Sequence, residues 1–111
     1  MNNQLVSDAQ VEAALDWLRD NADDIGDAKR EAVKTDHMLK HVKAIMMKQH
    51  NELAVSAQER EALASIEYHE ALLDAAKAAG EFERMKSLRE AAALKIEVYR
   101  SSSANYRAMK L

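Results

Sequence analysis

Apolar residues recur every three or four positions along most of this chain, and that spacing places them on one face of an α-helix. No stretch alternates with the period of two that marks a strand, and the chain has no Asn-Gly or Asp-Gly hairpin turn. It contains no proline and only two glycines. The pattern therefore predicts an all-α protein.

The first predicted helix is short. Ser7 and Gln10 form a capping-box pattern, in which each side chain bonds the other residue's backbone N–H group, so the helix is expected to begin there. Its apolar stripe includes Leu15 and ends at about Ala22. The next segment, NADDIGDAKR, is rich in Asn, Asp and Gly, which weaken a helix, so we predict a break around Gly26.

A second helix is predicted from about Asp24 to Lys48. Its small and apolar residues step by four and three in a heptad seam that consists of Ala28, Ala32, Thr35, Leu39, Val42, Met46 and Gln49. Met38 and Ile45 widen this stripe, which favours globular packing over a bare two-stranded coiled coil.

The segment QHNELAV is typical of a connection, and Ser56 with Glu59 forms a second capping-box pattern just after it. Ser65 is the best candidate for a kink or a restart, because serine can cap a helix locally. From Ile66 to about Arg107 a helix of roughly 60 Å is predicted. The residues that keep near-helical spacing along it are Ile66, Tyr68, Leu72, Ala75, Ala79, Phe82, Met85, Leu88, Ala92, Ile96 and Tyr99.

These elements predict one all-helical domain over residues 1–111, with three to four helices. The long C-terminal helix packs antiparallel to the second long helix. The second helix, at roughly 37 Å, is too short to cover the whole C-terminal helix. Helix one, a second copy of the chain, or both are left to cover the rest of its apolar face, so we expect a homo-oligomer.

The composition favours amphipathic helices over a thick core, since 48% of the 111 residues are hydrophobic but only 5% are aromatic. The chain has no cysteine, which excludes disulfides and thiolate sites. Its start lacks the basic and apolar parts of a signal peptide, and no run of roughly eighteen apolar residues occurs. We expect a soluble, intracellular protein that does not bind membranes.

The net charge of -3 hides alternating blocks of charge. Residues 1–27 carry a net -6 and residues 28–50 a net +4. Residues 51–83 again carry -6, and residues 84–111 carry +5. An antiparallel hairpin can place a basic block beside an acidic one, and the C-terminal segment is then the most basic surface.

Catalytic chemistry finds little support. His37 and His41 have the helical spacing of two metal ligands, but two ligands do not make a site. No histidine has a glutamate three residues before it, which disfavours the di-iron pattern of helical bundles. Both glycines are isolated, so no phosphate-binding loop exists. We expect no catalytic residues, no metal and no cofactor, and a protein that is not an enzyme.

The C-terminal stretch IEVYRSSSANYRAMKL is the best candidate for a working surface. Its helical spacing brings together one set of side chains, called here the C-terminal stripe: Tyr99, Arg100, Ser103, Tyr106 and Arg107. Small serines and tyrosines suit a close helix–helix interface, which we place first, and a plain solvated tail is second. Arginines beside tyrosines also suit phosphates and stacked bases, which we place third because the chain is acidic overall.

Three stretches, AALDWLRDNADDIG, SAQEREALASIEY and IEVYRSSSANYRAM, resemble small helical proteins encoded in the early DNA-metabolism or recombination regions of tailed bacteriophages and prophages. The resemblance implies a phage accessory protein that acts in the host cytoplasm, and it carries over no functional residues. The leading hypothesis is a non-enzymatic accessory protein that contacts a phage or host protein of DNA metabolism or recombination. The alternative is direct nucleic-acid binding by the basic segment Arg84 to Lys110.

Overall fold

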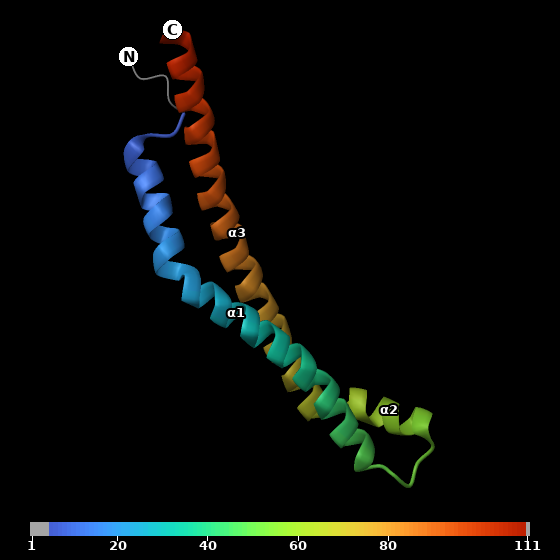
Figure 1. The fold of residues 1–111 in the computed structure, drawn as a ribbon. Coiled ribbons are helices and arrows are strands. Elements are labelled where there is room, and N and C mark those ends of the chain that lie inside the picture. Colours follow the sequence, from blue (N-terminus) through green and yellow to red (C-terminus); the bar gives the residue numbers. More distant parts are fainter. Residues whose placement is uncertain (1–4, 111) are drawn as a thin grey trace. The chain divides into compact units, whose positions relative to one another are not determined.

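The computed structural model describes residues 5–110 of the chain. Three helices make up nearly all of these residues (Figure 1): α1 (Asp8–Lys48, 41 residues), α2 (Val55–Leu63, 9 residues) and α3 (Ile66–Lys110, 45 residues). No strand occurs between residues 5 and 110. The predicted all-α fold is confirmed.

The helices form two compact units. Unit 1 contains α1 up to Ile25 and α3 from Arg84 onward, and unit 2 is the segment Gly26–Glu83. In each unit the segments of α1 and α3 lie side by side and run in opposite directions (Figure 1). The predicted antiparallel packing of the long C-terminal helix against a second long helix is thereby confirmed.

The start of α1 follows the predicted capping box. The backbone N–H of Ser7 donates to Oε1 of Gln10 at 2.8 Å, and the backbone N–H of Gln10 donates to Oγ of Ser7 at 3.2 Å. Asp8 lies in the first turn, where the positive end of the helix dipole favours a carboxylate. The first helix therefore starts where the sequence predicts.

The predicted break around Gly26 is wrong, because α1 continues through this segment to Lys48. Helical turns on both sides of Gly26 are held by local bonds: Nδ2 of Asn21 donates to the carbonyl of Trp17 at 2.9 Å, and Arg30 pairs with Asp27 at 2.9 Å. Ile25 is buried, so its packing opposes a break. A single glycine costs a helix only about 1 kcal/mol, which these interactions offset.

The uninterrupted α1 removes the length mismatch that led us to expect an oligomer. At about 1.5 Å per residue, α1 is about 62 Å long and α3 about 68 Å, so the two helices nearly match. Residues of the predicted first and second helices both pack against α3, each within its own unit. Any self-association needs a different physical reason.

The turn between α2 and α3 lies at Ser65, as predicted. Its hydroxyl accepts a hydrogen bond from the N–H of Tyr68 at 3.1 Å and donates one to the carbonyl of Ala62 at 2.7 Å. The capping box predicted for Ser56 and Glu59 is wrong, since Ala54 is the N-cap of α2 and makes no side-chain cap. Glu59 instead pairs with Lys43 of α1 at 2.7 Å and ties α2 to α1.

The buried core consists mainly of small side chains. Its apolar members are Ala14, Ile25, Ala62, Ala78, Met85 and Ala92. The predicted stripes are partly wrong: Leu15 is 51% exposed, Ile66 is 72% exposed, and Leu72 and Leu88 are also exposed. Buried Ala78, Met85 and Ala92 belong to a stricter register on α3 with steps of four and three, and Ile66, Leu72 and Leu88 fall outside it.

Replacement of Gly26 by alanine is expected to stabilise the protein by about 0.5–1 kcal/mol. The glycine is inside a helix, has no positive φ, and a Cβ added there meets nothing within 4 Å. Urea denaturation followed by circular dichroism measures this change. A loss of stability would show that the chain needs a flexible break at this position, as the sequence pattern first indicated.

Replacement of Ser65 by alanine is expected to cost about 1 kcal/mol, because the N–H of Tyr68 loses its cap. Ser56→Ala is the matched control and is expected to change stability by less than about 0.5 kcal/mol, since Ser56 lies within α2 and is exposed. The same denaturation measurement compares them, and equal effects would contradict the assignment of the cap to Ser65.

Candidate functional site

The C-terminal stripe is helical throughout. α3 continues through Ser101–Ser103 and reaches Lys110, so the three serines do not end the helix. Serine is only slightly less favourable in a helix than many other residues, and nothing after Gly80 interrupts the pattern. The stripe is therefore a helical surface, and its binding role stays a prediction.

Tyr99 anchors the stripe inside unit 1. Its hydroxyl donates to Oδ1 of Asp8 at 2.7 Å, which joins the end of α3 to the first turn of α1. Both Tyr99 and Ser103 are half-buried. The structure thus gives Tyr99 an architectural role that the spacing alone did not indicate, because Asp8 is 91 positions away in sequence.

The other three stripe residues are open to solvent. Tyr106 is 41% exposed, and both Arg100 and Arg107 are exposed. Arg100 pairs with Glu97, one turn earlier, at 3.6 Å. A hollow of about 400 Å³ lies at the stripe and is lined by Glu97, Tyr99, Arg100, Ser101, Ser103, Ala104 and Arg107. The stripe therefore offers one exposed aromatic ring and two arginines beside a shallow hollow.

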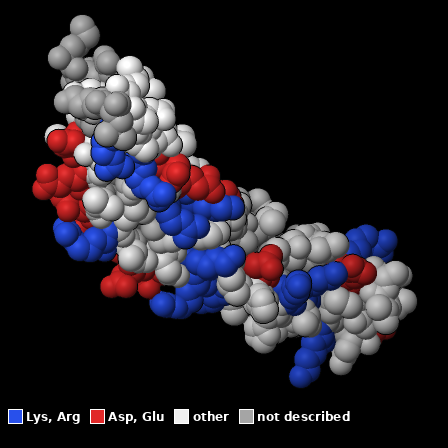
Figure 2. All heavy atoms as spheres, turned by 45° about the horizontal axis from the view of Figure 1, so that its top comes forward, with Lys and Arg blue, Asp and Glu red and all other residues white. Residues whose placement is uncertain are grey.

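Unit 1 combines an acidic helix segment with a basic one. Most acids of α1 in this unit are four residues apart on one face: Asp8, Glu12, Asp16, Asp20 and Asp24. Arg19 lies among them, and its hydrogen bond to Asp20, followed by the charges of Asp20 and Asp16, raises the pKa of its guanidinium. Acidic and basic groups lie beside each other on the face drawn in Figure 2. Glu90 and Glu97 also lie among the basic residues of α3 in unit 1, and Glu97 pairs with Arg100, so this segment carries both charges along its length.

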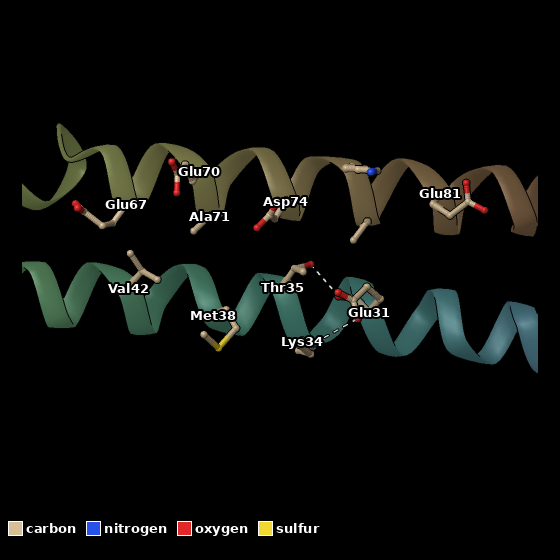
Figure 3. A pocket seen from close by; sticks show the side chains of 12 residues that line it. Glu31, Lys34, Thr35, Met38, Val42, Glu67, Glu70, Ala71, Asp74 and Glu81 are labelled. Atoms are coloured by element: carbon tan, nitrogen blue, oxygen red, sulfur yellow. Dashed lines mark hydrogen bonds and ion pairs between the residues drawn. The ribbon is translucent and has the colours of Figure 1, made fainter.

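Unit 2 contains a second hollow, which the sequence did not indicate. This groove, of about 690 Å³, lies between α1 and α3 (Figure 3). Its lining consists of Glu31, Lys34, Thr35, Met38 and Val42 from α1 and Glu67, Glu70, Ala71, Asp74, Lys77, Ala78 and Glu81 from α3. The sequence does contain small residues, Thr35, Ala71 and Ala78, and a block of acidic residues near the latter two. This pattern indicates a groove only once the register of the two helices is known.

The histidines do not assemble with acids into a larger set of ligands. His37 and His41 are both exposed on α1. Within the part of the chain that the structure describes, no group of three or more His, Cys, Asp or Glu side chains is placed to hold a metal ion.

Tyr99→Phe is expected to lower the free energy of unfolding by about 1 kcal/mol, because Asp8 loses the hydroxyl that donates to it. A double-mutant cycle with Asp8→Ala, which removes the accepting carboxylate, is expected to show coupling between Asp8 and Tyr99. Additive effects of the two substitutions in urea denaturation would contradict an architectural role for Tyr99.

Comparison with protein-family models, with curated proteins and with solved structures finds no match to this chain. Across the described residues, none of the helices combines the length and the apolar character needed to cross a membrane.

Proposed function

We propose that this chain is a non-enzymatic bacteriophage accessory protein that acts through protein–protein contacts in phage DNA metabolism or recombination in the host cytoplasm. The observation that carries the contact role is the amount of apolar side chain left outside the hairpin. Ile66 and Leu94 are 72% and 63% exposed, and no large side chain among the described residues is fully buried. Exposed apolar surface of this kind marks interaction sites.

Exposed leucines give a reason for self-association that does not depend on helix length. Leu72, Leu73, Leu88 and Leu94 of α3 are each at least 40% exposed. A contact between copies removes such side chains from water, and burial of apolar area is the main favourable term in association.

The phage setting rests on the resemblance of the three quoted stretches. The non-enzymatic character is supported by the nature of the hollows, whose carboxylates, such as Glu67, Glu70 and Asp74, are exposed. General acid–base catalysis uses groups held in an enclosed pocket, where their protonation is tuned. An open helical groove suits the binding of another polypeptide better.

Direct nucleic-acid binding by the basic segment of α3 is the second candidate. It is favoured by Arg100 and Arg107, which line one hollow together with Tyr99. Arginines contribute phosphate contacts and an aromatic ring can stack on a base. Glu97 weighs against it, because its carboxylate pairs with Arg100 at the same place.

Substitutions at the exposed residues of the C-terminal stripe distinguish the two candidate functions. The tagged chain, expressed in cells in which the phage replicates, is expected to retain proteins of DNA metabolism or recombination, identified by mass spectrometry. Tyr106→Ala is expected to reduce their capture several-fold, because it removes an exposed aromatic ring. The same variant leaves the bond between Tyr99 and Asp8 in place, and circular dichroism checks that its helix content is unchanged.

Arg100→Ala with Arg107→Ala is the comparison variant, and fluorescence anisotropy with short single- and double-stranded DNA is the companion assay. If the protein acts through protein–protein contacts, neither the wild-type chain nor the arginine variant is expected to bind either DNA appreciably. DNA binding that weakens steeply with salt and is lost in the arginine variant would instead establish the nucleic-acid alternative. Capture of no DNA-metabolism protein by the wild-type chain would overturn the proposed setting.

A further inference from the structure

The groove of unit 2 combines a narrow apolar floor with an acidic rim. Thr35 and Val42 point from α1 toward α3, and Ala71 points back toward α1 (Figure 3). Thr35 is buried and its hydroxyl is satisfied by the carbonyl of Glu31 at 2.8 Å, so the floor has little need of further polar partners. Met38 lines the groove and is exposed.

The rim carries more acids than bases. Five carboxylates line the groove, Glu31, Glu67, Glu70, Asp74 and Glu81, against two lysines, Lys34 and Lys77. Lys34 lies 3.6 Å from Glu31 on its own helix. The groove therefore suits a ligand with apolar side chains for the floor and positive charges for the rim.

A helix with that character is the natural occupant of such a groove. Recognition of an amphipathic helix in a groove uses apolar anchors three or four residues apart on one face. The α3 side of the groove extends from Glu67 to Glu81, which is about 21 Å of helix. A complementary face of two to four turns fits this length.

This chain carries such a face on α3 in unit 1. The anchor face consists of Leu88, Ala91, Leu94 and Lys95, all of which are exposed. At 100° per residue these positions lie within about 120° of arc on one side of the helix. They belong to residues 84–111, which carry a net +5, whereas most of the rim belongs to residues 51–83, which carry -6.

We propose that the groove of unit 2 in one copy binds the anchor face of a second copy, so that the chain self-associates by helix-in-groove contact. The proposal rests on the proposed function, since it makes protein–protein contact the role of these surfaces. In this contact, Leu88 and Leu94 of the second copy pack against Met38, Val42 and the alanines of the groove floor and are removed from water. Lys95 lies against the acidic rim, where opposite charges favour the encounter.

A stable interface buries about 800 Å² on each partner. Each copy carries both the groove and the anchor face, so copies can associate either as a closed pair, in which the contact is made twice, or as a longer chain of copies.

Sedimentation velocity of the purified full chain tests the proposal. The wild-type protein is expected to self-associate at about 100 µM and to dissociate as salt rises, because the rim contact is electrostatic. The face variant Leu94→Asp and the groove variant Glu70→Lys with Asp74→Lys are each expected to weaken association by about tenfold or more.

Matched controls change the same chemistry elsewhere on the surface. Leu15→Asp introduces the same acid at another exposed leucine, and Glu12→Lys with Asp23→Lys makes the same change of charge on α1. Both controls are expected to associate within about threefold of the wild type. Circular dichroism establishes that each variant keeps its helix content.

Mixing the two damaged variants gives the sharpest result. The face variant retains an intact groove and the groove variant retains an intact anchor face, so an equal mixture is expected to associate more strongly than either variant alone. A monomeric wild type, or unchanged association in both variants, overturns the proposal. So does a mixture that fails to associate.

The experiment also separates this inference from the proposed function. Suppose that the pure wild-type chain is monomeric and captures a protein from cells, and that the variant with Glu70 and Asp74 replaced does not capture it. The groove then binds a different protein and not a second copy. That result overturns the second copy as occupant and leaves a protein-contact function standing. If the wild-type chain self-associates as expected but captures no protein of DNA metabolism, the groove contact stands and the proposed setting is overturned.

Discussion

The structure depends on the pairing of two long helices through a narrow seam of small side chains. The packing of one helix on another buries one stripe of each, and here that stripe contains Ala14, Ala78 and Ala92. An alanine brings little apolar area out of water. The larger residues that amphipathic helices normally bury, such as Leu15 and Leu94, remain exposed. Both the thin core and the exposed apolar side chains follow from this one arrangement.

Local signals in the sequence were sufficient for some helix boundaries. Ser7 and Ser65 cap helices through bonds to residues three positions away, so the pattern contains all the partners. The continuity of α1 through Gly26 was missed, because it depends on the burial of Ile25 against other parts of the chain. Ser56 shows the converse error, since a correct capping pattern occurs one residue inside a helix that begins at Val55.

For the candidate surfaces too, the sequence predicted what depends on local spacing and missed what depends on contacts between distant segments. Helical spacing placed the C-terminal stripe on one helix, since all five residues belong to α3. The bond from Tyr99 to Asp8 was beyond the sequence pattern, because it joins opposite ends of the chain. The groove was missed for a similar reason: Thr35 faces Ala71 and Ala78 only when the register of α1 on α3 is fixed. Local periodicity determines which residues share a face, and tertiary register determines what that face meets.

A thin core also couples folding to association. The free energy of folding is a small difference between large terms, and a two-helix seam contributes little apolar burial to it. A partner that binds only the folded chain adds stability that grows with the logarithm of its concentration. If the partner is a second copy, the chain's own concentration sets part of its stability. The acidic rim on unit 2 and the basic segment of α3 then give such contacts a preferred pairing, which an apolar surface alone would not provide.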